Sequence, residues 1–395
     1  MNFSFIQWII IVILSLLTAL EPLSIDLYLP GFLQISEAFN TSTSSVQISL
    51  STFLGGFAIG QLLWGPLADR FGRKKPILLS LFIFIAASLA CIYVKTIEQL
   101  WVVRFVQAIG GCGGVVISRA IVTDYFDKSK TLKIFSLLAL IMGIAPIIAP
   151  SLGNGILKVM DWKGLFLGMM ALGVLSFLLV LFLLPETHKN RSSRNTNVAK
   201  GYLEILKVKK FVVYSLIAGL INGALMIYVA NGPFLIMETG GFSSNAFSLI
   251  FAINAFGLMA GSYIAGVMQK YTSTEKIVKY SLIFMSIVSA VLLTLMYANA
   301  SIVVILVAIF LYLLPLGVLL PTTTELAITP FTNNSGTASA LFGSIQLAVA
   351  FICSLGANSL SNNSVIAVGI ALMLCILAAM GILSLFGISS KLPAR

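Results

Sequence analysis

Twelve long apolar segments follow one another along the whole chain, and short polar connections separate them. A transmembrane helix needs about 20 apolar residues, and a helix satisfies all of its own backbone polar groups within lipid. The sequence therefore predicts an all-α membrane protein with twelve transmembrane helices. The segments are approximately residues 5–29, 43–65, 76–94, 99–121, 131–154, 164–184, 211–232, 244–267, 277–297, 300–325, 337–358 and 363–388.

The composition excludes most soluble classes of protein. Only 9% of the 395 residues are charged and 59% are hydrophobic, whereas about a quarter of a soluble domain is charged. A disordered chain, a secreted disulfide scaffold and an ordinary cytosolic enzyme are therefore excluded. We expect no metal site, because the single histidine, His188, lies alone in a polar connection. The chain also lacks the glycine-rich P-loop that binds ATP.

The basic residues are distributed unevenly between the two sets of alternate connections. Most of the 24 lysines and arginines lie in the connections 2–3, 4–5, 6–7 and 8–9 or in the C-terminal tail. The opposite side holds only Lys95, Lys158 and Lys163, and Arg104 lies inside a segment. Because basic residues remain on the cytoplasmic side, both termini are predicted to be cytoplasmic. The net charge of +11 then reflects topology, and we expect no nucleic-acid partner.

The longest polar segment lies at the midpoint of the chain. It covers residues 185–210 and has the composition of a flexible, charged linker. Six segments on each side suggest an internal duplication, and Pro30-Gly31-Phe32 has an echo in Gly232-Pro233-Phe234. We therefore divide the chain into an N-terminal six-helix half (1–184), a cytoplasmic linker (185–210) and a pseudo-symmetric C-terminal six-helix half (211–395).

The connection between segments two and three carries the most specific motif. Residues 65–75 read GPLADRFGRKK, which resembles the signature loop of the major facilitator superfamily. A cluster of bases alone would not explain the acid or the glycine spacing. The residues that carry the match are Gly65, Asp69, Arg70, Gly72 and Arg73.

Further matches cover nearly the whole chain and narrow the resemblance. Together they resemble the bicyclomycin-resistance (Bcr/CflA) group of drug:proton antiporters. The resemblance implies a multi-pass exporter of the bacterial inner membrane that exchanges protons for small organic molecules. The motifs are DLYLP at 26–30, RFVQAIGG at 104–111, RAIVTD at 119–124, GIAPIIAP at 143–150, DWK at 161–163, LPET at 184–187 and GTASAL at 336–341.

The resemblance also implies a conformational latch at the cytoplasmic ends of the helices. Arg73 is expected to pair with Asp124 at the end of segment four. Asp69 is expected to face the positive end of segment eleven, near Gly336 and Thr337. Such contacts would hold the halves together in one state and break in the other. The 8–9 connection lacks the acid and the second glycine, so we expect the latch to be asymmetric.

Proton coupling is assigned to the ionisable residues inside the segments: Asp26, Arg104 and Glu21. Each costs about 2.5–3.5 kcal/mol at the centre of a membrane helix, so a function is the default interpretation. Asp26 is the expected proton-binding acid; the alternative is a boundary residue that ends segment one. Arg104 lies at a similar depth, so the two could pair, and its alternative role is a structural ion-pair partner.

The sequence leaves the roles of two glutamates undecided. Glu21 is five residues from Asp26, so the two point about 140° apart on a helix. Glu21 is either a second acid in the cavity or a hydrogen-bonding partner of a neighbouring helix. Glu325, near the end of segment ten, is either simply exposed to water or specific to the substrate of this protein.

Segment five carries a motif that resembles one of antiporters. It consists of Gly143, Pro146, Pro150 and Gly153. The prolines should bend the helix, and the glycines permit close helix packing. Ala145 stands where many members of the family have glycine, and the alternative is an ordinary kinked membrane helix.

The expected function is therefore proton-driven export of drugs or similar small amphipathic molecules, by rocking of the two halves. The alternative cargo is an endogenous metabolite or a siderophore. A membrane enzyme is disfavoured, because it needs clustered acids, histidines or metal ligands, and a receptor is disfavoured by the lack of a sizeable soluble domain. We expect a monomer in the lipid bilayer whose partner is the small-molecule substrate, with no cofactor and with protons as the coupling ion.

Overall fold

The computed structural model describes residues 4–187, 198–331, 335–361 and 364–386. All regular structure in these ranges is helical, and twelve helices are long and apolar enough to cross a membrane. The elements are α1 (Phe5–Asp26), η1 (Leu29–Gly31), α2 (Phe32–Ala38), α3 (Thr43–Phe71), α4 (Lys74–Tyr93), α5 (Ile97–Tyr125), α6 (Lys128–Leu157), α7 (Lys163–Leu183), α8 (Val198–Leu206), α9 (Lys209–Pro233), η2 (Phe234–Thr239), α10 (Ser244–Met268), α11 (Thr274–Tyr297), α12 (Ile302–Ile328), α13 (Ser335–Ser361) and α14 (Val365–Phe386).

These elements confirm the predicted class, and several helices extend beyond the apolar segments. For example, α3 continues to Phe71 and α5 to Tyr125, several residues past the predicted ends. Hydropathy marks only the part of a helix in the hydrocarbon, whereas the backbone hydrogen bonds continue into the polar interface.

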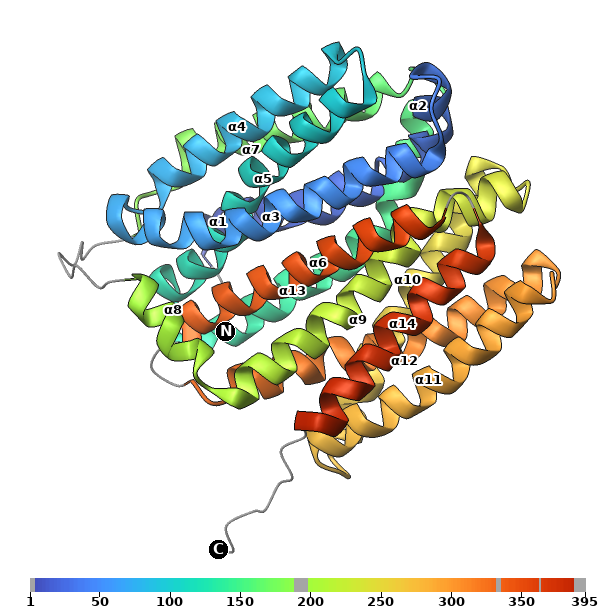
Figure 1. Ribbon diagram of the computed structural model, residues 1–395. Helices are drawn as coiled ribbons and strands as arrows, with labels where there is room; N and C mark the ends of the chain where they lie inside the picture. The colour runs from blue at the N-terminus through green and yellow to red at the C-terminus, as the bar shows by residue number, and fades with distance from the viewer. Residues whose placement is uncertain (1–3, 188–197, 332–334, 362–363, 387–395) are drawn as a thin grey trace, which may run out of the picture.

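The helices form two groups that lie side by side (Figure 1). We call α1–α7 the N half and α9–α14 the C half. Within the N half α3 packs against α5 and α4 against α7, and in the C half the corresponding pairs are α10 with α12 and α11 with α14. The halves meet along α3 with α13 and along α6 with α10. This repeated arrangement confirms the predicted pseudo-symmetry of the fold.

The first helix of each half is interrupted at an equivalent place. After α1 the chain forms the 3-10 turn η1 and then α2, whereas α9 passes at Pro233 into the π-helical turn η2. Proline has no amide hydrogen to donate, so it disturbs the helical series of bonds. The short sequence echo between residues 30–32 and 232–234 thus lies where both helices change geometry.

The midpoint linker is more ordered than its composition predicts. Residues 188–197, including His188, lie outside the described ranges, but Val198–Leu206 forms α8. This helix contacts both α13 and α9, and Ile205 is buried against the core. Tyr202 and Ile205 are spaced to share one face of a helix, a signal that the polar composition around them hides. Figure 1 places α8 at the end of the bundle where α1 begins and α14 ends; we call this the near end and the opposite one the far end.

Candidate functional site

Asp26 is the last residue of α1 and is almost fully buried, with 4% of its surface exposed. It interacts electrostatically with Glu21 of the same helix and with Tyr228 of the C half. The Tyr228 hydroxyl accepts a hydrogen bond from Asn254 Nδ2 at 2.8 Å. Asp26 is therefore buried rather than exposed, within electrostatic range of Tyr228 of α9.

Arg104 is completely buried and binds the end of α1. Its Nη2 donates to the carbonyl oxygen of Ser24 at 3.0 Å, and its Nη1 donates to Gln107 Oε1 at 2.6 Å. The last carbonyls of a helix lack partners within the helix and carry partial negative charge, so this end attracts a cation. The expected pairing with Asp26 is not formed: in the described part of the chain, no carboxylate lies within ion-pair distance of Arg104.

Three aromatic rings enclose the guanidinium group of Arg104. Its Cζ lies 4.7 Å from the ring centroid of Tyr28, 4.3 Å from that of Phe53 and 5.9 Å from that of Phe166. A desolvated cation against aromatic faces gains about 2 kcal/mol, which offsets part of its burial cost. The sequence analysis missed these rings, although Tyr28 stands two residues after Asp26 in the quoted motif.

Arg119 extends the charged region along α5. It is exposed, it lies fifteen residues after Arg104, and it interacts electrostatically with Glu21. The sequence analysis placed Arg119 in the RAIVTD motif and gave it no part in proton coupling. The structure brings Arg119 of α5 within electrostatic range of Glu21 of α1.

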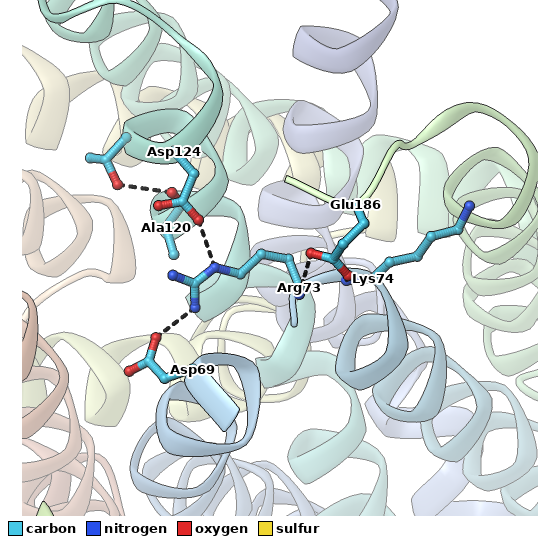
Figure 2. Close-up of polar contacts among 7 residues, drawn as sticks. Asp69, Arg73, Lys74, Ala120, Asp124 and Glu186 are labelled. Carbon is cyan, nitrogen blue, oxygen red and sulfur yellow. Dashed lines mark hydrogen bonds and ion pairs between the residues drawn. The ribbon is translucent and has the colours of Figure 1, made fainter. Parts of the chain in front are cut away.

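Arg73, one of the residues expected to form a latch, lies between two carboxylates of the N half (Figure 2). Its Nε donates to Asp124 Oδ2 at 2.7 Å and its Nη1 to Asp69 Oδ1 at 2.6 Å. Burial acts to lower the pKa of Arg73, but the hydrogen bonds to Asp124 and Asp69 outweigh it and raise that pKa above its ordinary value. The structure thus brings Arg73 and Asp124 together in the arrangement that the resemblance implied.

Glu186 completes this cluster, and the sequence analysis gave it no role. Its Oε1 accepts from the backbone amide of Arg73 at 2.9 Å and its Oε2 from that of Lys74 at 3.2 Å (Figure 2). A carboxylate at the start of α4 satisfies amides that have no helical acceptor. Gly72 has a φ of +88°, and a Cβ there would lie 2.6 Å from Glu186 Oε2. Both its conformation and the nearby carboxylate therefore require glycine.

Asp69 has no described hydrogen bond or ion pair with the start of α13, which it was expected to face. Its carboxylate bonds to Arg73 within the N half, and its electrostatic neighbour outside that half is Tyr202 of α8. Burial raises the pKa of Tyr202, and the charge of Asp69 adds to that increase. Of the other motif residues, Arg70 lies over the ring of Phe71, with its Cζ 5.2 Å from the ring centroid. Gly65 has open space around it, because a Cβ added there would meet no atom within 4 Å.

The motif of segment five lies on α6, which continues through Pro146 and Pro150 and contacts both halves. A Cβ at Gly153 would lie 2.2 Å from the carbonyl oxygen of Leu27, so α6 packs closely against the chain just after Asp26. At Gly143 the nearest atom is Met259 Cγ of α10, at 3.6 Å from a built Cβ. This approach is ordinary van der Waals contact, so only Gly153 is required by packing here.

Side-chain hydrogen bonds join the halves toward the far end. They link α3 to η2 and α13, and α6 to α10. In this conformation the far end is closed, whereas Asp69, Arg73 and Asp124 at the near end bond within the N half. The bonds between the halves include Thr43 Oγ1 to Glu238 Oε2 (2.9 Å), Ser51 Oγ with Ser354 Oγ (2.7 Å), Asn358 Nδ2 to Ser51 Oγ (3.2 Å) and Asn154 Nδ2 to Asn245 Oδ1 (2.5 Å). Near the middle of α3, Ser344 Oγ of α13 also donates to the carbonyl oxygen of Ala58, at 2.9 Å.

Glu325 occupies the position in the C half that corresponds to Asp124. It accepts hydrogen bonds from Gln269 Nε2 and Thr274 Oγ1, so it ties α12 to the connection between α10 and α11. Glu325 follows Asp124 by 201 residues, and Thr274 follows Arg73 by the same number. The two donors to Glu325 are uncharged, unlike Arg73 beside Asp124. Glu325 is exposed, which agrees with the interpretation from the sequence that it is exposed to water.

Comparison with known proteins identifies the family. The Major Facilitator Superfamily model matches residues 14–354. An uncharacterized MFS-type transporter, YdgK, of Bacillus subtilis (strain 168) is 35% identical over 96% of this chain and 95% of its own length. A bicyclomycin resistance protein homolog of Haemophilus influenzae is 31% identical over 87% of each chain.

A solved structure supports the same fold. The crystal structure of a D-xylose-proton symporter covers 95% of this chain and 97% of its own, with a TM-score of 0.79 at 16% identity. At that identity the likeness shows the fold alone. The family match and the relatives agree with the resemblance to the bicyclomycin-resistance group, and the chain therefore belongs to the major facilitator superfamily of multi-pass membrane transporters for small molecules.

Proposed function

We propose that the chain is a proton-coupled antiporter that exports drugs or similar small amphipathic molecules across the bacterial inner membrane. The observation that carries this proposal is the buried Asp26, which lies at the break of α1 within electrostatic range of Tyr228 of the C half. In the described part of the chain, no cation lies within ion-pair distance of it. No ion pair thus holds Asp26 in its ionised form in this conformation.

The coupling follows from competition for this carboxylate. An ionised carboxyl group in a closed, apolar environment is costly, so Asp26 favours its protonated form when no ligand is present. A substrate that favours the ionised form releases the proton, and a proton that binds releases the substrate. Because the coupling between two ligands is reciprocal, this competition is sufficient for antiport.

Alternating access would come from rocking of the halves. We assign the two moving units to residues 1–184 and 211–395, joined by residues 185–210. The hydrogen bonds at the far end would hold this conformation, and the cluster of Asp69, Arg73 and Asp124 would exchange partners when the near end closes. The basic residues at the near end favour placing it, with both termini, in the cytoplasm. We infer that the protein acts as a monomer.

The cargo has two candidates. The names of relatives favour drugs, since one is a bicyclomycin resistance protein homolog and another is a multidrug resistance protein of Klebsiella pneumoniae. The exposed Arg119 near Glu21 favours a cargo that carries a negative as well as a positive charge, which includes many endogenous metabolites and siderophores.

Inside-out vesicles with an acidified lumen test the proposal. Candidate compounds are added outside, and lumenal pH is followed with a fluorescent dye for wild type and Asp26→Asn. Glu37→Gln, an exposed acid of α2, is the matched control. We expect compounds to trigger proton efflux in wild type and in the control but not in Asp26→Asn. Proton efflux that persists in Asp26→Asn would show that Asp26 is not the coupling acid, and Glu21 would become the candidate. Uptake of a compound without any proton movement would overturn proton coupling.

A further inference from the structure

A cavity of about 360 Å³ lies between α6 of the N half and α10 of the C half. It is separate from the region around Asp26 and Arg104, since neither residue lines it. Leu249 at its edge is 64% exposed, so the cavity opens on the flank of the bundle. That flank faces the bilayer in a membrane-spanning protein.

The polarity of the cavity changes along the helix axes. The hydrogen bond from Asn154 to Asn245 fixes the antiparallel register of α6 and α10. Toward the middle of the bundle the lining is apolar, with Ile147 and Ala252. Toward the far end it is polar, and Lys158 lies at the rim. Ile147 and Lys158 are eleven residues apart, or about 16 Å along a helix.

Lys158 provides the only positive charge in this lining. In the described part of the chain, no carboxylate lies within ion-pair distance of it. Asn154, one turn earlier, has only 9% of its surface exposed. An amide and a cation on one wall, with apolar side chains about three turns deeper, match a molecule that has an anionic head and an apolar tail.

We propose that this cavity binds an anionic membrane phospholipid, with the phosphate at Lys158 and the Asn154–Asn245 pair and the upper acyl chain over Ile147 and Ala252. The lipid would contact both halves at once. It would therefore favour the conformation in which the far end is closed, because a ligand shifts an equilibrium toward the state that it binds better. The proposal does not depend on the cargo or on proton coupling.

Native mass spectrometry of the purified full chain in detergent tests this site, with phosphatidylglycerol and phosphatidylcholine as the probes. Lys158→Gln removes the charge. Gly155→Leu fills the cavity, since a Cβ at Gly155 meets no atom within 4 Å. The matched controls are Lys95→Gln, a lysine outside the cavity on the same side by sequence, and Gly266→Leu, a helical glycine of α10 that also has open space. Thermal unfolding in lipid-free detergent checks that all four variants fold.

We expect wild type to bind phosphatidylglycerol in preference to phosphatidylcholine. Lys158→Gln should weaken phosphatidylglycerol binding about five-fold, the effect of one basic residue near an anionic headgroup. Gly155→Leu should weaken the binding of both lipids, and the two controls should bind as wild type does. Equal binding by wild type and both cavity variants would overturn the proposal, as would an equal loss in Lys95→Gln. Complete competition by millimolar inorganic phosphate would identify a site for a free anion rather than a lipid.

Discussion

Arg104 donates a hydrogen bond to the carbonyl oxygen of Ser24, 3.0 Å away, rather than forming an ion pair with Asp26. The guanidinium charge is therefore directed at the end of α1 and at the surrounding aromatic rings. Asp26, two residues after Ser24, keeps a carboxyl group that no arginine or lysine of the described chain holds by an ion pair. A proton-exchanging acid requires this separation, because a tight ion pair would keep it ionised.

Replacement of Arg104 by lysine tests whether the planar guanidinium, and not only its charge, is needed. An ammonium cannot reach Ser24 and Gln107 with two fixed donors or stack in the same way on Phe53. We expect Arg104→Lys to lower the free energy of unfolding by about 2 kcal/mol and to reduce transport. Thermal unfolding in detergent and vesicle transport measure both effects. Lys270→Arg, the reverse exchange at an exposed site, serves as the control, and an Arg104→Lys protein as stable and active as that control would contradict this role.

The contact between Gly72 and Glu186 predicts coupled mutational effects. Gly72→Ala should cost about 1–2 kcal/mol, because a residue with a side chain is strained at this positive φ and its Cβ meets the carboxylate. Glu186→Ala should cost about 1 kcal/mol through the loss of the cap on α4. The double variant should lose less stability than the sum, since removal of Glu186 relieves the steric conflict. Strictly additive losses in thermal unfolding would contradict a direct contact.

A cross-link at the far end tests the rocking of the halves. The Ser51 and Ser354 hydroxyl oxygens are 2.7 Å apart, so cysteines at both positions should form a disulfide. The background is a chain in which the four native cysteines are replaced by alanine. Oxidation should abolish vesicle transport and reduction should restore it, whereas Ser51→Cys alone should respond to neither treatment. Full transport by a chain shown to be cross-linked would contradict alternating access through this end.

The positive charge of Arg119 is expected to influence which charge classes of substrate the protein prefers. Arg119→Gln removes the cation near Glu21 and should raise the KM for zwitterionic or anionic compounds about tenfold, from about 1.5 kcal/mol for one charge-assisted hydrogen bond. The KM for purely cationic compounds should stay the same or fall. Lys270→Gln, at an exposed site in the 8–9 connection, is the control. A uniform loss of transport for all charge classes would assign Arg119 to structure instead of selectivity.

The sequence predicts the helices and their grouping well, because the hydrocarbon core imposes length and composition on every span. It predicts side-chain partners poorly, because the direction in which a side chain points depends on how the helices pack against one another. Asp26 and Arg104 have similar depth along their helices, but depth does not show that the guanidinium points at the Ser24 carbonyl. Asp69 was assigned a partner on α13, but its carboxylate bonds to Arg73 within its own half.

For two further residues, Glu186 and Glu325, the sequence held a signal of their structural role. Glu186 lies in the quoted LPET motif, but only the fold places that motif beside the amides of Arg73 and Lys74. Glu325 could have been identified from the internal repeat, since it stands 201 residues after Asp124. Its donors are uncharged, so a search for charged pairs passes over it.

The most direct test of the central claim is substrate-induced proton release from the purified protein. The full chain in weakly buffered detergent solution is mixed with a transported compound, and a pH-sensitive dye reports the protons released. We predict release from wild type and from Glu37→Gln, and none from Asp26→Asn. Equal release from wild type and Asp26→Asn, with the compound bound in both, would contradict the assignment of Asp26 as the carboxyl group for which proton and substrate compete.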